Sequence, residues 1–285
     1  MGLLASKTIV ITGGSLGIGY EIAKKCASEG ATVIIAARNK AALENALVEL
    51  KQISNNNHQQ YSLDVSKYEE VKRFASWSSS NFSHIYALVN CAGIYGPIGR
   101  IHQISMEKFT KAIQINFLGT VYMCHAFIPI IKSNTRKKII NFSGGGAASP
   151  FPHYSAYATS KIAIVRFTEN LSIELSKEEF DINCIAPGFV ITRLHQQTIE
   201  AGPELATKEF FENTRKQMES GGVPIEKAVD LALFLLSSDS DGITGKFISG
   251  PWDPWQDKDF LKKLRIDKDF AVLRRIDEKT FYKKT

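Results

Sequence analysis

Tyr157 and Lys161 stand four residues apart, and this spacing places both side chains on one face of a helix. A free phenol has a pKa near ~10, so it exchanges protons poorly near neutrality. A lysine cation nearby favours the phenolate and lowers that pKa. Tyr154 lies close by, but the residue four positions after it is Ala158, so only Tyr157 has such a partner. The pair predicts a tyrosine that transfers protons, although the same spacing also occurs in helices where it is purely structural.

A glycine-rich segment near the N-terminus has the composition of a phosphate-binding loop. It runs from Thr12 to Gly19, between a β-branched run and a helical pattern. Glycines permit backbone conformations and close approach that other residues forbid, and the N–H groups at a helix start favour a pyrophosphate. Strand, glycine turn, helix and second strand follow in the order of a dinucleotide-binding unit, with a merely structural turn as the alternative. The loop residues expected to contact the cofactor are Gly13, Ser15, Leu16, Gly17, Ile18 and Gly19.

The end of the second predicted strand carries the signal for cofactor choice. A site for NAD usually places an acidic residue there to bind the ribose hydroxyls, whereas an arginine accommodates a 2′-phosphate. This chain has Arg38 and Asn39 after Ala37, with no acid. The sequence therefore predicts a preference for NADP(H), with NAD(H) possible and an ordinary surface arginine as the alternative.

These residues are spread along a regular alternation of strands and helices. Apolar β-branched runs predict strands at Thr8–Thr12, Val33–Ala37, Tyr61–Asp64, Ala87–Asn90, Lys138–Phe142, Ile182–Ala186 and Lys246–Ser249. Helical patterns lie between them near Ile18–Ser28, Lys40–Lys51, Lys67–Trp77, Met106–Lys132, Ser155–Ser176 and Ile225–Leu236. Continuous apolar strands separated by helices indicate a parallel sheet covered on both faces. We therefore expect an α/β fold, a Rossmann-type doubly wound parallel sheet of about seven strands with helices on both faces.

Residues 1–250 are expected to form a single Rossmann-type dinucleotide-binding and catalytic domain. Within it, residues 188–222 are long and polar and carry their own helix signal around Glu204–Met218, which is typical of a lid over a substrate site. Residues 251–285 follow the last strand as a C-terminal tail extension that the sheet does not need. In this tail, Trp252 and Trp255 can either close the pocket or serve an interface.

Taken together, the chain resembles a short-chain dehydrogenase/reductase of the compact, non-extended type over about residues 5–250. The motifs that carry this resemblance appear in family order: the glycine loop at 12–19, Asp64-Val65, Asn90 to Gly93, Asn116, a serine before the active helix, the pair at 157 and 161, and Pro187-Gly188 with Thr192. No one of these motifs is decisive, but seven in the same order are very specific.

The resemblance implies a role for each matched residue. Tyr157 would donate or accept the substrate proton, Lys161 would hold the nicotinamide ribose as well as tune the tyrosine, and Asn116 would anchor a water in the proton relay. The other implied cofactor-binding residues are Asp64 and Val65 at the adenine, Asn90 in the cofactor trough, Thr192 at the nicotinamide end, and Pro187. Together with Arg38 these roles describe hydride transfer between a nicotinamide and a carbonyl or alcohol.

One position departs from the family pattern. A serine hydroxyl usually stabilises the developing alkoxide, and counting back thirteen residues from Tyr157, the family's usual spacing, gives Gly144. Ser143 stands one position earlier. Either the glycine-rich loop holds one extra residue and Ser143 serves as the donor, or the donor is missing or replaced. We take Ser143 as the candidate.

Composition limits the remaining possibilities. Hydrophobic content of 44% and charged content of 22% are those of an ordinary globular protein, and no apolar run approaches the roughly 20 residues of an integral membrane span. Four well-separated cysteines suit neither a zinc site nor a disulfide framework, so we expect reduced thiols, no metal and a cytoplasmic location. The excess positive charge lies largely in the tail, without the interleaved basic stripe of a nucleic-acid binder. The family resemblance further implies a homodimer or homotetramer.

The leading hypothesis is thus an NADP(H)-dependent oxidoreductase acting on a small-molecule carbonyl or secondary alcohol, with Tyr157 as general acid and base. A nucleotide-binding or scaffold protein with reduced catalysis is an alternative that Gly144 alone supports. A sugar epimerase or dehydratase is a weaker alternative, since related extended enzymes share the tyrosine–lysine pair but differ in glycine spacing and C-terminal length.

Overall fold

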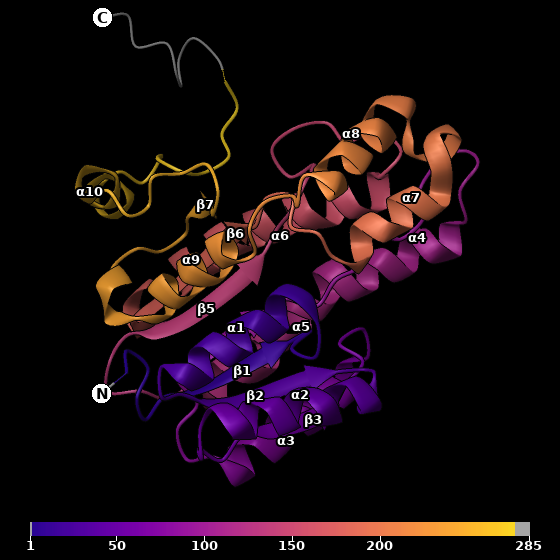
Figure 1. The fold of residues 1–285 in the computed structure, drawn as a ribbon. Helices are drawn as coiled ribbons and strands as arrows, with labels where there is room; N and C mark the ends of the chain where they lie inside the picture. The colour runs from indigo at the N-terminus through magenta and orange to yellow at the C-terminus, as the bar shows by residue number, and fades with distance from the viewer. Residues whose placement is uncertain (1, 277–285) are drawn as a thin grey trace, which may run out of the picture.

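Seven parallel strands form one sheet in the order β3-β2-β1-β4-β5-β6-β7 (Figure 1). The computed structural model describes residues 2–276; residues 277–285 of the tail lie outside the described residues. The strands are β1 (Thr8–Thr12), β2 (Thr32–Ala37), β3 (Gln59–Ser62), β4 (Ala87–Asn90), β5 (Lys137–Phe142), β6 (Phe180–Ala186) and β7 (Phe247–Ser249). This is the doubly wound Rossmann-type architecture expected from the sequence.

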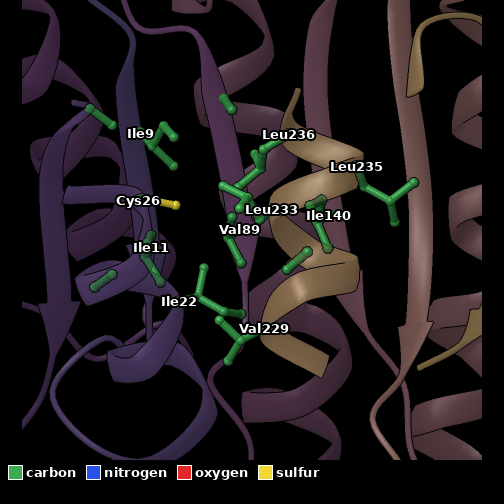
Figure 2. Packing of buried hydrophobic residues seen from close by; sticks show 14 of the residues in the cluster. Ile9, Ile11, Ile22, Cys26, Val89, Ile140, Val229, Leu233, Leu235 and Leu236 are labelled. Carbon is green, nitrogen blue, oxygen red and sulfur yellow. The ribbon is translucent and has the colours of Figure 1, made fainter. Parts of the chain in front are cut away.

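Alternation along each strand divides the core into two layers. In β1, Ile9 and Ile11 belong to one buried cluster and Val10 to the other, because successive side chains point to opposite faces of the sheet. Figure 2 shows the first layer, where Ile22 lies beside Val229 and close to Val89. The central strands are buried on both faces, as a parallel sheet covered by helices requires, whereas the edge strand β3 is only partly buried.

Helices cover both layers. In chain order they are α1 (Gly17–Ser28), α2 (Lys40–Ile53), α3 (Tyr68–Asn81), α4 (Met106–Ile113), α5 (Gly119–Phe127), α6 (Ser155–Glu174), α7 (Arg193–Ala206), α8 (Lys208–Glu219), α9 (Glu226–Leu236) and α10 (Lys258–Ile266). Helices α1, α2, α9 and α10 supply the first layer, whereas α3, α5 and α6 supply the second. The predicted helices on both faces are confirmed.

The single helix predicted at Met106–Lys132 is in fact segmented. A π-helical turn, Gln114–Leu118, separates α4 from α5, and a 3₁₀ turn, Ile128–Ile130, ends the run. A π-turn inserts a residue and often marks a functional position; here it contains Asn116. By length and composition alone, Met106–Ile130 could cross a membrane, but core helices of globular proteins pass the same test. In this fold the run packs against α3 and α6.

Strand β3 lies two residues earlier than predicted. The last backbone hydrogen bond to β2 runs from the Leu63 N–H to the Ala37 carbonyl. The next residue, Asp64, leaves the sheet, because its N–H donates to Glu70 Oε2 instead. Asp64 therefore stands in the loop beyond the strand end rather than within the strand.

The segment predicted as a lid contains two helices, α7 and α8, which stand together beyond one end of the sheet (Figure 1). Gly202, with φ of 76°, breaks α7 before Pro203. The Tyr154 hydroxyl, at the start of α6, is 2.9 Å from Thr198 Oγ1 in α7, and a second bond joins His153 to Leu205. Side-chain contacts therefore hold α7 against the start of α6.

The first part of the tail packs on the domain. Trp255 is buried, and its indole N–H donates to the Gly250 carbonyl. Lys246 donates to the carbonyls of Asp267 and Phe270, and the Phe247 N–H donates to the Ala271 carbonyl at the edge of β7. Trp252, by contrast, is exposed.

Candidate active site

The predicted site residues gather at the carboxyl ends of β1, β4 and β5. Strand order reverses between β1 and β4, so the loops that follow these two strands run to opposite sides and leave a crevice between them. The glycine loop follows β1, Asn90 ends β4 and leads into the segment 91–93, and Ser143 follows β5. A crevice at such a switch point is where open α/β sheets bind their ligands.

Backbone geometry requires glycine in the loop after β1. Gly13 has φ of 67°, in the left-handed region, and a Cβ there would lie 3.0 Å from the Ala92 backbone. A Cβ on Gly19 would lie 2.5 Å from the Gly13 carbonyl oxygen. Leu16 occupies the N-terminal cap position of α1, where its side chain makes no hydrogen bond, and the first turn of α1 contains no acidic residue. The start of α1 therefore keeps free N–H groups for an anionic group, and the loop fits a pyrophosphate.

The expected adenine end lies beyond β2 and β3. Arg38 is exposed at the end of β2. Asp64 accepts hydrogen bonds from the Ser66 N–H and hydroxyl, and it lies 3.6 Å from the Lys111 ammonium. Burial alone raises the pKa of Asp64, but the Ser66 hydrogen bonds and the charges of Lys111 and Arg38 outweigh burial and lower the pKa. Asp64 is therefore an ionised acceptor. Val65 is buried and belongs to the second core layer.

Asn90 is buried within the sheet. Its amide donates to Asn141 Oδ1 at 2.9 Å and to Cys124 Sγ at 3.4 Å, while its Oδ1 is buried without a partner among the described residues. Asn90 thus ties β4 to β5 at the floor of the crevice.

Asn116 is fully buried in the π-turn, and both its amide oxygen and its amide nitrogen are hydrogen-bonded. It accepts from the Ile94 N–H at 2.8 Å and donates to the Ile94 carbonyl and to Ser160 Oγ, both at 2.9 Å. A Cβ on Gly93 would lie 3.4 Å from Asn116 Oδ1 and 3.5 Å from Lys161 Nζ. Asn116 and Lys161 therefore both lie near Gly93, at ordinary contact distance from the place of a Cβ there.

Tyr157 and Lys161 share one face of α6, as the spacing predicts. Lys161 Nζ lies 5.5 Å from the centre of the Tyr157 ring and donates to the Phe142 carbonyl at the end of β5 at 2.8 Å. Both side chains are buried, at 7% and 4% exposure. The Tyr157 hydroxyl has no hydrogen-bond partner within residues 2–276, which leaves its proton available to a ligand.

Burial reverses one expectation from the sequence. It raises the pKa of Tyr157 and lowers the pKa of Lys161 to about 8, because a low-dielectric site disfavours both the phenolate and the ammonium. The expectation that Lys161 lowers the phenol pKa is therefore wrong for the protein chain by itself. Helical spacing fixes the distance between the two groups, but desolvation decides the direction of the shift.

Gly144 and Ser143 occupy different surroundings. A Cβ on Gly144 would lie 2.1 Å from the Tyr157 hydroxyl oxygen, so the phenol packs directly against this glycine. Ser143 is buried, and its hydroxyl donates to the Lys161 carbonyl at 3.4 Å. The Ser143 and Tyr157 hydroxyls, both in the described part of the chain, are not hydrogen-bonded to each other.

Pro187 and Thr192 follow β6 and lead into α7. Pro187 is buried, and the next residue, Gly188, has φ of 79° and lies against Pro251 of the tail. Thr192 is the N-terminal cap position of α7, and its Cγ2 is 3.8 Å from the place of a Cβ on Gly17. The start of α7 therefore reaches the glycine loop across the crevice.

An aromatic cluster surrounds Tyr157, and the sequence patterns did not reveal it. The Tyr95 ring lies edge-on to Tyr157 at 4.8 Å between centroids, and Phe151 stacks on Tyr154 at 4.3 Å. We call this group the Tyr157 cluster; its members are Tyr95, Phe151, Tyr154, Tyr157 and Phe210. They come from the loop after β4, the start of α6 and α8, and no local spacing links such distant segments. The position of Tyr95 two residues after Gly93 was the available signal.

Fold and site together define a dinucleotide-binding α/β protein with a tyrosine–lysine pair in its crevice. A profile of the short chain dehydrogenase family matches residues 7–202. The chain belongs to the short-chain dehydrogenase/reductase family. It is an NAD(P)-dependent oxidoreductase that acts on CH–OH and C=O groups of small molecules.

Curated relatives match nearly the whole described domain. The chain is 34% identical to the 3-oxoacyl-[acyl-carrier-protein] reductase FabG of Chlamydia trachomatis over 256 residues, which cover 87% of this chain and 97% of that protein. It is 27% identical to dehydrogenase/reductase SDR family member 4 of Sus scrofa, covering 86% of each. Among solved structures, an NAD⁺-bound xylitol dehydrogenase shares the fold with a TM-score of 0.77 at 24% identity, covering 86% of this chain and 98% of that one.

Proposed function

We propose that the protein is an NADP(H)-dependent oxidoreductase in which Tyr157 exchanges a proton with a carbonyl or secondary alcohol substrate. The observation that carries the proposal is the hydroxyl of the largely buried residue Tyr157, which has no hydrogen-bond partner within residues 2–276 and lies one helical turn from Lys161. A general acid must hold its proton near neutrality and face the reacting oxygen. The raised pKa of Tyr157 is consistent with a protonated donor in the reductive direction.

The surrounding residues have assigned tasks in this proposal. The glycine loop and the start of α1 would hold the pyrophosphate, Arg38 would hold the 2′-phosphate, and Asp64 would lie at the adenine. The remaining residues that would contact the cofactor are Val65, Asn90, Pro187 and Thr192. When bound, the nicotinamide supplies or accepts hydride. Lys161, with a pKa of about 8, holds the ribose and supplies charge beside Tyr157. Asn116 and Lys161 both lie near Gly93, and in this proposal Asn116 anchors a water of the proton relay.

Tyr157→Phe tests the mechanism, with Tyr154→Phe as the matched control. Both substitutions remove a phenolic hydroxyl near the start of α6. The Tyr154 hydroxyl, however, is already hydrogen-bonded to Thr198 and is not available to a substrate. NADPH oxidation is followed with a panel of ketones that includes 9,10-phenanthrenequinone, and NADPH binding is followed by fluorescence. Loss of a general acid is expected to lower kcat by about 10²–10⁴-fold, with NADPH binding retained. Undiminished turnover in Tyr157→Phe refutes the proposed role.

The remaining features complete the proposal. Helices α7 and α8 act as the substrate lid of a domain spanning residues 1–250, and the protein is a cytoplasmic homodimer or homotetramer. The four cysteines are free, in line with a reducing compartment. A nucleotide-binding protein with reduced catalysis is the second candidate, which Gly144 favours; absence of turnover in the wild-type protein despite NADPH binding would select it.

A further inference from the structure

Only some of the hydroxyls around Tyr157 are free to bind a substrate oxygen. Ser143 donates to the Lys161 carbonyl, and Tyr154 is paired with Thr198 at 2.9 Å. The Tyr95 and Tyr157 hydroxyls, in contrast, make no hydrogen bond within the described residues 2–276. Gly144, at the family's serine position, contributes no side chain. The cluster therefore presents two unengaged phenols and no unengaged serine hydroxyl.

Tyr95 is held firmly beside Tyr157. Its ring stands edge-on to Tyr157 at 4.8 Å and 88°, and edge-on to Tyr154 at 5.2 Å, and it is only 3% exposed. The loop that carries Tyr95 is fixed at the preceding residue, Ile94. The Ile94 N–H donates to the Asn116 side chain, and the Ile94 carbonyl accepts from it. Such a ring keeps its hydroxyl in one place, which is what a donor toward a developing charge requires.

His195 is the other polar group in this region, and it is a less suitable donor. Its ring lies 6.1 Å from Tyr95, and its Nδ1 is buried without a partner among the described residues. Burial lowers the pKa of His195 to about 4, so the imidazole is neutral and carries one N–H. The Val190 backbone interacts with this imidazole, and a neutral imidazole has only one N–H to donate.

We propose that the Tyr95 hydroxyl takes the place of the family's serine and donates a hydrogen bond to the substrate oxygen beside Tyr157. This inference rests on the proposed function of the same site. Tyr157 would pass its proton to the oxygen, and the reduced nicotinamide, when bound, would supply the hydride to the carbonyl carbon. Tyr95 keeps its own proton throughout and stabilises the charge that builds on the oxygen.

The electrostatics of Tyr95 suit a donor that never ionises. Burial raises the pKa of the Tyr95 hydroxyl, and the charges of ionised Tyr157 and Tyr154 would raise it further. The hydroxyl therefore stays protonated at any pH at which Tyr157 works. A phenol reaches farther from its backbone than a serine, which allows a donor on the loop after β4 to serve a site that lacks a side chain at Gly144.

The test compares Tyr95→Phe with Ser143→Ala and Tyr154→Phe. Turnover is measured with NADPH and 9,10-phenanthrenequinone, a rigid aromatic diketone that suits an aromatic site. Loss of one donor to the developing oxyanion is expected to lower kcat by about 10²–10³-fold, with KM for NADPH and its binding unchanged. Because Tyr95 does not titrate, the pH profile of the residual activity should keep its midpoint. Ser143→Ala and Tyr154→Phe should each lose less than Tyr95→Phe.

A second readout does not depend on turnover. Binding of the quinone to the NADP⁺-saturated protein, followed through tryptophan fluorescence, should weaken in Tyr95→Phe relative to Tyr154→Phe. If Tyr95→Phe keeps wild-type kcat and quinone affinity while Tyr157→Phe is inactive, the assignment of Tyr95 fails and the proposed function stands. If Ser143→Ala shows the larger loss, Ser143 is the donor. If Tyr157→Phe keeps full turnover, the proposed function fails and this inference fails with it.

Discussion

Replacing Gly144 by serine, the residue that the family usually has at this spacing, is expected to damage this protein rather than improve it. A Cβ at position 144 would lie 2.1 Å from the Tyr157 hydroxyl oxygen and 3.0 Å from the ring carbon that carries it. Ordinary van der Waals contact begins at 3.4 Å. The phenol or the loop must therefore move by about 1.3 Å, the difference between 3.4 and 2.1 Å.

The size of that movement sets the expected effect. Misplacing a reacting group by about 1 Å can cost on the order of 10²-fold in rate, and overpacking a buried site costs about 1–3 kcal/mol in stability. Gly144→Ser should thus lower kcat/KM by about 10²-fold and lower the thermal midpoint, while NADPH binding is retained because the new Cβ would meet Tyr157 and not the glycine loop. Steady-state reduction of 9,10-phenanthrenequinone and thermal melts measure both effects.

Gly145→Ser is the matched control for this experiment. A Cβ on Gly145 would meet only the Phe151 ring, at 3.6 Å, which is ordinary contact, and the position is exposed. Its activity should stay close to that of the wild-type protein. The reasoning is refuted if Gly144→Ser turns over as fast as the wild type at unchanged stability, because the phenol would then have room that the structure denies it.

Three further changes test other parts of the structure. Lys138 is fully buried and donates to Asp181 at 2.8 Å and Asp241 at 2.6 Å, so Lys138→Ala should lower the free energy of unfolding in urea by about 3–5 kcal/mol; a loss below about 1 kcal/mol contradicts this. Burial lowers the pKa of His195 from 6.5 to about 4. As the pH falls below 6.5, the imidazole is therefore protonated in the unfolded chain before it is protonated in the folded one. The free energy of unfolding, at its full value above pH 6.5, should then decline toward pH 4 by no more than about 3 kcal/mol. His195→Leu should remove that slope from melts recorded across this range, and an unchanged slope assigns it to other groups. Arg38→Glu should reduce kcat/KM for NADPH by about 10–100-fold without a matching loss for NADH, and an equal effect of Lys40→Glu would show that only general charge is involved.

Much of the fold could be predicted because its signals are local. Six of the seven strands began within two residues of their predicted positions and ended where predicted, since continuous β-branched runs have few alternatives in a parallel sheet. Strand β3 was misplaced because Gln59 and Gln60 give no apolar signal, although pairing with β2 places the strand at Gln59–Ser62. The π-turn at Gln114–Leu118 was missed because helical periodicity does not register one inserted residue.

The site divides along a similar line. Helix geometry alone put Tyr157 and Lys161 on one face of α6, and glycine content alone marked the loop that approaches Ala92. Local sequence also exposed the departure at Gly144. No local pattern could say where the Ser143 hydroxyl points or that Tyr95 stands against Tyr157, because those contacts join β4, β5 and α6 across the sheet.

The sequence by itself determined the order of strands and helices, the glycine loop and the one-turn distance between phenol and ammonium, because each depends on residues that are neighbours along the chain. Only the tertiary structure decided that burial raises the pKa of Tyr157, and that its hydroxyl fills the space where a serine Cβ would stand. Desolvation and steric exclusion are sums over every segment packed around a group. Those segments meet only when the sheet and its two helical layers have assembled.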